Sequence, residues 1–69
     1  MDLSNNRIKE VMKKRDIIQE DLEKMTGITQ GELSLIIAGK KKRVTFINIA
    51  KISIALGYSV EYLWPGVFK

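Results

Sequence analysis

The chain has 69 residues, 45% of them hydrophobic, and contains neither cysteine nor histidine. This length supports one domain with a small core, and the lack of cysteine excludes disulfides as its reinforcement. The usual zinc ligands and the usual general base are also missing, so we expect no metal, no cofactor, no small-molecule substrate and no enzymatic activity. Twelve Lys and Arg against eight Asp and Glu give a net charge of +4, which favours a polyanionic partner.

No stretch of the sequence is suited to a membrane span. The longest apolar segment, residues 44–56, is too short and is interrupted by polar side chains. We therefore expect a soluble, cytoplasmic protein without a membrane partner.

The first predicted helix starts after Ser4 and carries the apolar stripe Ile8, Val11 and Met12. Ser4 is a suitable N-cap, and Leu3 precedes it at the position from which a side chain packs on Ile8. Basic residues occupy the solvent side and the last turn, and we interpret them as a solvated face. These residues are Lys9, Lys13, Lys14 and Arg15.

The second predicted helix covers residues 19 to 25 or 26, with Leu22 and Met25 facing inward. Its N-cap position holds Ile18, which lacks the side-chain oxygen that is typically worth about 1 kcal/mol there. We expect this end to fray or to use Asp16 as its cap.

A turn centred on Gly27 leads into the third predicted helix, so residues 19–39 have helix-turn-helix spacing. Thr29 and Glu32 form a capping box at its start, and Gly39 ends it with a positive φ. The outward face of this helix holds Gln30, Gly31, Ser34 and Leu35, and a run of cations follows it: Lys40, Lys41, Lys42 and Arg43.

Residues 44–56 contain many β-favouring side chains, but Thr45 as N-cap and Gly57 as stop enclose a segment of helical length. We predict a helix whose inner face is made of Phe46, Ile49, Ile52 and Leu56. Ile47 and Ile54 lie on a different side, which implies that the helix is central or that part of it meets another molecule.

Ser59 caps a last short helix, which Pro65 and Gly66 terminate. The predicted architecture is therefore an all-α, compact five-helix bundle in which residues 1–69 form a single domain.

The order and spacing of these features resemble the Cro and cI-type repressors, also called XRE-type helix-turn-helix proteins. The resemblance covers Ile8 to Trp64 and depends on Gln19, Leu22, Thr26-Gly27-Ile28-Thr29, Leu33, Ile36, Gly39-Lys40, Ile52 and Ala55-Leu56-Gly57. It implies a lambda-repressor-like DNA-binding domain, in which the second helix crosses the phosphate backbone and the third enters the major groove.

The resemblance implies base contacts for Gln30, Gly31, Ser34 and Leu35. Gln30 suits the N6 and N7 edge of adenine, and Leu35 suits a thymine methyl. Gln19 is expected to brace Gln30 and to hold a phosphate, together with Lys40, Lys41, Lys42 and Arg43. Because Gly31 and Leu35 offer so little to a base, two interpretations stay open: specificity through DNA shape, or a surface used for protein contacts.

Family members generally bind DNA as two-fold dimers, so an interface is required. Our candidate is the C-terminal tail, residues 60–69, with Tyr62, Trp64, Val67 and Phe68, joined by Ile47 or Ile54 of the preceding helix. The alternative is that Trp64 closes the core of its own bundle. We expect a small transcriptional repressor of the kind found in phages or prophages, which binds an inverted repeat in double-stranded DNA as a homodimer. The rival interpretation is an antirepressor or antitoxin that binds a protein partner through Leu35 and Ile37.

Overall fold

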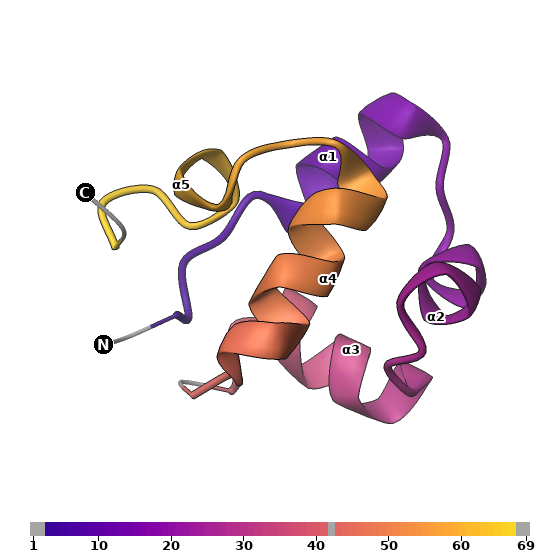
Figure 1. The fold of residues 1–69 in the computed structure, drawn as a ribbon, viewed down its shortest axis with the longest axis horizontal. Helices are drawn as coiled ribbons and strands as arrows, with labels where there is room; N and C mark the ends of the chain where they lie inside the picture. The colour runs from indigo at the N-terminus through magenta and orange to yellow at the C-terminus, as the bar shows by residue number, and fades with distance from the viewer. Residues whose placement is uncertain (1–2, 42, 68–69) are drawn as a thin grey trace.

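Five helices follow one another along the chain, as the sequence predicts (Figure 1). The structure is a computed structural model and describes residues 3–41 and 43–67. The helices are α1 (Ile8–Arg15), α2 (Gln19–Thr26), α3 (Gln30–Ile37), α4 (Phe46–Leu56) and α5 (Val60–Leu63). The described residues contain no strand, so the β-favouring segment before Gly57 is a helix and the all-α prediction is confirmed. No helix in this part of the chain is long and apolar enough to cross a membrane.

Helix α4 is the central element of the bundle. It packs against α1, α2 and α5, and α2 in turn packs against α3. In Figure 1 the α2–α3 pair lies to the right of and below α4, while α5 lies to the left. The turn between α2 and α3 is therefore on the side of the molecule away from α5.

Side-chain oxygens cap three of the helices, each at the predicted residue. Thr29 accepts a hydrogen bond from the Glu32 amide at 3.3 Å, and Thr45 accepts one from the amide of Asn48 at 3.2 Å. Ser59 does the same for the Tyr62 amide at 3.1 Å. Each bond satisfies an N–H group that has no partner inside its own helix.

The start of α1 differs from the prediction, because Ser4 is not its cap. The helix begins at Ile8, whose amide donates to Asn6 Oδ1 at 3.1 Å. The Asn6 amide donates in turn to the carbonyl oxygen of Ile36 at 3.0 Å. One side chain thus both orders the first turn of α1 and ties it to the end of α3.

The start of α2 is stabilised by an acidic side chain three residues inside the helix. Asp21 accepts a hydrogen bond from the backbone amide of Ile18 at 3.3 Å. Asp16, the cap that we expected, instead ends α1 in the left-handed conformation at φ 57°.

Two residues predicted to face inward are exposed. The side chain of Met25 is 52% exposed and that of Phe46 is 76% exposed. Phe46 is the first residue of α4 and precedes the part of the helix that meets its neighbours, so burial begins only at Ile49. Ile47 and Ile54 are exposed as well, at 65% and 81%.

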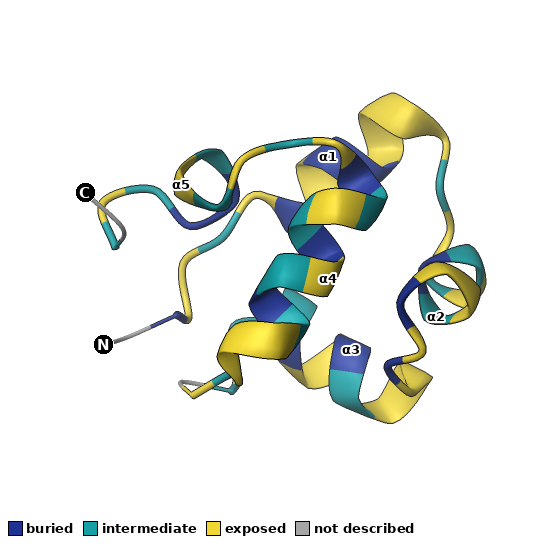
Figure 2. Ribbon diagram, viewed as in Figure 1, coloured by how far each residue is buried: buried dark blue, intermediate teal, exposed yellow. Residues whose placement is uncertain are grey.

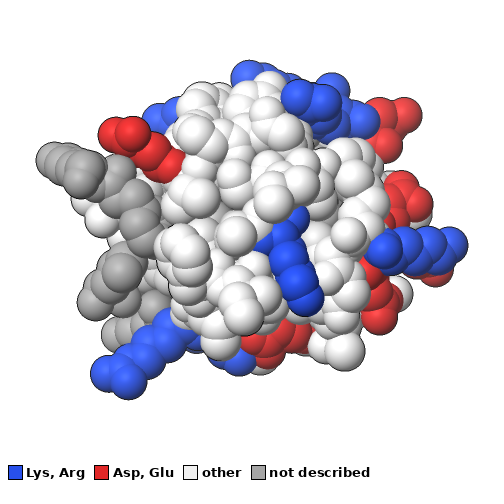
Figure 3. Space-filling model, viewed as in Figure 1, with Lys and Arg blue, Asp and Glu red and all other residues white. Residues whose placement is uncertain are grey.

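Ile47 and Ile54 lie on the side of α4 opposite the core, and the exposed Lys51 lies between them along the helix. Figure 2 shows buried and exposed residues alternating along α4, and Figure 3 shows that the face of the molecule over this helix is mostly uncharged apart from a basic side chain near its centre. We refer to Ile47 and Ile54 as the outer stripe of α4.

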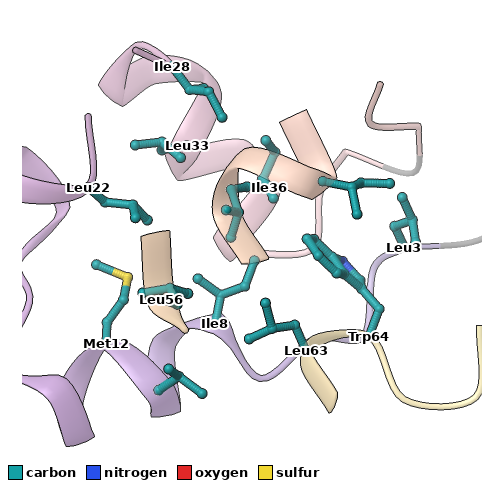
Figure 4. Packing of buried hydrophobic residues seen from close by; sticks show 13 residues of the cluster. Leu3, Ile8, Met12, Leu22, Ile28, Leu33, Ile36, Leu56, Leu63 and Trp64 are labelled. Atoms are coloured by element: carbon teal, nitrogen blue, oxygen red, sulfur yellow. The ribbon is translucent and has the colours of Figure 1, made fainter. Parts of the chain in front are cut away.

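The hydrophobic core is built from every helix and from the segment before α1 (Figure 4). Burying a Leu or Ile side chain contributes about 1.5–3 kcal/mol, so this cluster supplies most of the folding free energy. Its buried members are Leu3, Ile8, Val11, Met12, Leu22, Ile28, Leu33, Ile36, Ile49, Ile52, Leu56, Leu63 and Trp64.

Candidate nucleic-acid interface

The turn between α2 and α3 is held by its own hydrogen bonds. Gly27 has φ 77°, a conformation that suits glycine, and its amide donates to the Glu23 carbonyl at 2.7 Å. The hydroxyl of Thr26 donates to the Leu22 carbonyl at 2.7 Å and accepts from the Ile28 amide at 3.1 Å. Because Ile28 is itself buried, the turn is anchored to the core and fixes the angle between the two helices.

Gln19, the first residue of α2, binds α3 at two points. Its side-chain amide nitrogen donates to the carbonyl oxygen of Gln30 at 3.0 Å and to Ser34 Oγ at 2.8 Å. The expected brace is therefore present, but it acts on the backbone of Gln30 and on Ser34 rather than on the side chain of Gln30.

The same bonds limit how Gln19 can contact a phosphate. An amide NH₂ has two hydrogens, and both are engaged here. The donors that remain at this end of α2 are backbone amides of its first turn, which is the usual way in which a helix N-terminus holds an anion.

The four predicted base-contact residues all lie on the exposed face of α3. Gln30, Gly31, Ser34 and Leu35 are exposed, whereas Leu33 and Ile36 on the opposite side are fully buried. Gly31 has open space around it, because a methyl group added there meets no other atom within 4 Å. Its missing side chain is thus not a requirement of the fold.

The basic segment after α3 is only partly available to a partner. The ammonium group of Lys41 lies 2.7 Å and 2.6 Å from the two carboxylate oxygens of Glu32. Lys40 and Arg43 are exposed, and Lys42 lies outside the described residues. Glu32 was expected to complete the capping box by binding the Thr29 amide, and it pairs with Lys41 instead.

Gly39 sets the direction of this segment. It has φ 73°, as predicted, and an added Cβ atom there falls 2.1 Å from the backbone oxygen of Ser4. The amides of Lys40 and Lys41 both donate to the Leu35 carbonyl, at 3.0 Å and 3.3 Å. The chain therefore leaves α3 pressed against the N-terminal segment.

The structure corrects the prediction that Trp64 forms a dimer contact. Its side chain is 0% exposed and closes the core of its own bundle, with its ring directed into the buried cluster (Figure 4). Val67 is half-buried, and Phe68 lies outside the described residues.

Tyr62 is half-buried and already engaged within its own chain. Its hydroxyl donates to Glu10 at 3.3 Å, its ring stacks on Tyr58 at 4.9 Å, and the Arg7 guanidinium lies 4.6 Å from the ring centre. These contacts join α5 to α1.

The structure also reveals a surface that the sequence reading overlooked. A groove of about 680 Å³ lies between α1, the start of α2 and the end of α3, and Lys9 and Lys13 line it together with Gln19 and Ser34. The only signal in the sequence was the four-residue spacing of the two lysines, which also describes any solvated helix face.

The sequence profile of the helix-turn-helix family matches residues 8–63, which is most of the chain. No curated protein and no solved structure shows significant similarity to it. The matched region begins with α1 and ends with α5, and it contains the braced pair α2 and α3. With its five-helix fold and this match, the chain belongs to the XRE-type helix-turn-helix family.

Proposed function

We propose that this chain is a transcriptional repressor that binds an inverted repeat in double-stranded DNA as a homodimer. Family membership supports sequence-specific DNA binding by a small regulator. The observation that carries the proposal is the exposed face of α3, which Gln19 and the buried turn hold at a fixed angle to α2. A phage or prophage regulator acting on a promoter in the cytoplasm fits this description.

In the proposed complex α3 lies in the major groove. The Gln30 amide reads the N6 and N7 edge of adenine, Ser34 donates its own hydroxyl hydrogen to a base acceptor, and Leu35 contacts a thymine methyl. Gly31 lets the backbone of α3 approach the bases closely. Lys40 and Arg43 hold phosphates, while the backbone amides at the start of α2 hold another.

The proposed dimer contact includes the outer stripe of α4. A single unit touches few base pairs, so two recognition helices about 34 Å apart are needed for useful affinity. Since Trp64 is buried and Val67 is half-buried, the described part of the tail offers little apolar surface, whereas Ile54 is 81% exposed. Exposed apolar side chains that share one face of a helix suit an interaction site.

The test is a selection of bound sequences from random duplex DNA at a stated salt concentration. We expect a palindromic consensus, since a two-fold dimer reads the same half-site twice. Enrichment of a single, non-repeated site contradicts the dimer, and a pool without enrichment contradicts sequence-specific binding.

The exposure of Leu35, 45%, favours one rival: a protein-interaction module such as an antirepressor or antitoxin. Ile37, the other residue of that docking face, is half-buried against the core, which makes the face smaller than the sequence suggests. A chain that binds no duplex at low salt but forms a stable complex with a repressor or toxin supports this rival.

A further inference from the structure

The groove beside α3 places two cations next to the residues that orient the recognition helix. Lys9 and Lys13 are one helical turn apart on α1 and share the groove lining with Gln19 and Ser34. Gln19 and Ser34 are also the two residues joined by the 2.8 Å hydrogen bond. The groove therefore adjoins the exposed face of α3.

Neither lysine forms an ion pair with a described residue. Both are exposed, and in the described part of the chain the acidic groups close enough for an ion pair reach only Lys41. Glu10, the one carboxylate on α1, faces Tyr62 in α5. The groove thus has a positive rim with no carboxylate among its lining residues.

The floor of the groove suits the stems of these lysines. Met12, Ile17 and Ile37 line it too, and apolar neighbours of this kind can pack against the aliphatic part of a lysine whose ammonium group stays in water.

The groove and the Lys41 side chain lie on opposite flanks of the exposed face of α3. With 3.6 residues per turn, Ser34 and Ile37 fall on one flank of that face and Glu32 falls on the other. Glu32 holds Lys41 on its flank, whereas Ser34 and Ile37 line the groove.

We infer that Lys9 and Lys13 hold phosphates of the second DNA strand that borders the major groove. A helix that fills this groove, about 12 Å wide, has one phosphate backbone on each side. The basic segment after α3 binds one of these phosphate backbones, and Lys9 and Lys13 of α1 bind the other. The inference rests on the proposed function, since it assigns a second phosphate contact to the same DNA complex.

The test is a salt series of DNA titrations with a fluorescent mixed-sequence duplex at low ionic strength. The variants are Lys9→Gln and Lys13→Gln, and the control is Lys14→Gln, an exposed residue of the same helix that does not line the groove. The slope of log K against log salt is negative, and we expect each groove variant to reduce its magnitude by about 0.9, the value for one lost phosphate contact. The control keeps the wild-type slope.

The outcomes separate this inference from the proposed function. If the wild type binds and both groove variants keep its slope, α1 does not contact DNA and the inference is wrong. If the wild type binds no duplex, DNA binding itself fails.

A second measurement locates the contact on the duplex selected by the wild type. Single phosphates of this duplex are replaced, one at a time, by neutral methylphosphonates. At the phosphate that Lys9 holds, we expect the replacement to weaken binding of the wild type but not binding of Lys9→Gln, which has already lost that contact. If every replacement weakens Lys9→Gln as much as it weakens the wild type, Lys9 holds none of these phosphates.

Discussion

The side-chain amide of Gln19 donates to the hydroxyl of Ser34 over 2.8 Å, so the first residue of α2 holds the exposed face of α3. The same nitrogen holds the carbonyl of Gln30 at 3.0 Å, one helical turn earlier. These two attachment points on consecutive turns add to the buried Leu33 and Ile36, which set the rotation of α3 about its own axis. Gln19 thus braces the exposed side of a helix whose other side is packed in the core.

Replacing Gln19 by Ala is expected to impair DNA binding more than folding. Both hydrogen bonds are exposed, so their loss lowers the free energy of unfolding by an amount near the lower end of about 0.5–1.5 kcal/mol per bond. We expect a loss of about tenfold in DNA affinity, or 1.4 kcal/mol, because α3 is no longer held in register. Urea unfolding and fluorescence anisotropy measure the two quantities. Equal affinity of the variant and the wild type contradicts a role for this brace.

Replacing Gly31 by Ala is expected to separate stability from DNA binding. The position is helical and open, so alanine raises the free energy of unfolding by about 0.5–1 kcal/mol. The added methyl group projects from the face proposed to approach the bases, and we expect weaker binding to the selected duplex. Tighter binding by the more stable variant contradicts the close approach of α3.

Gly39 is the matched control for that substitution. Here φ is 73° and an added Cβ atom meets the backbone oxygen of Ser4, so alanine is expected to destabilise the fold. A thermal unfolding midpoint above that of the wild type contradicts this packing.

Neutralising Glu32 is expected to strengthen DNA binding. In Glu32→Gln the ammonium of Lys41 loses its carboxylate partner and becomes free to contact a phosphate. Because the pair is partly exposed, the free energy of unfolding changes by less than about 1 kcal/mol. We expect the magnitude of the negative slope of log K against log salt to increase by about 0.9, as for one added contact. Glu61→Gln, an exposed residue of α5, controls for net charge, and an equal gain in both variants contradicts the assignment.

The predictions that follow from local rules are correct where the partners are close together in the chain, whereas the brace from Gln19 to α3 was expected only from the family resemblance. The caps at Thr29, Thr45 and Ser59 each act on an amide three residues away, so a local rule is sufficient. The positive φ of Gly39 is local in the same way.

The predictions that failed depend on packing between distant segments. Asn6 displaces Ser4 at the start of α1 because it also reaches Ile36, thirty positions away. Phe46 has the right helical phase for the core, but no neighbouring element covers the first turn of α4. The pairing of Glu32 with Lys41 and the lysine-lined groove likewise arise only when separate segments meet.

Substitutions of Trp64 test whether its ring belongs to the core of its own bundle or to a dimer interface. Its indole Nε1 is buried without a hydrogen-bond partner among the described residues, so Trp64→Phe removes a donor without breaking a bond. We expect this variant to lose much less stability than Trp64→Ala, for which truncation of a buried ring costs about 3–5 kcal/mol. Calorimetry measures both. A folded Trp64→Ala variant with wild-type stability contradicts the place of this ring in the core.

Ile54 provides the corresponding test of the dimer. Its side chain is 81% exposed on the outer stripe of α4, so Ile54→Lys is expected to leave the fold intact. If two copies meet there, the substitution places two cations against each other in an apolar contact, and sedimentation equilibrium should show a dimer for the wild type and a monomer for the variant. Met25→Lys makes the same kind of change at a residue that is 52% exposed on α2 and should keep the wild-type mass.

The Ile54→Lys variant is also expected to bind the full inverted repeat no better than a single half-site, because only a dimer gains affinity from the second half-site. If Ile54→Lys has the mass of a dimer, the dimer contact does not include α4. If the wild type is a monomer in solution but binds the full repeat more tightly than a half-site, dimerisation occurs only on the DNA.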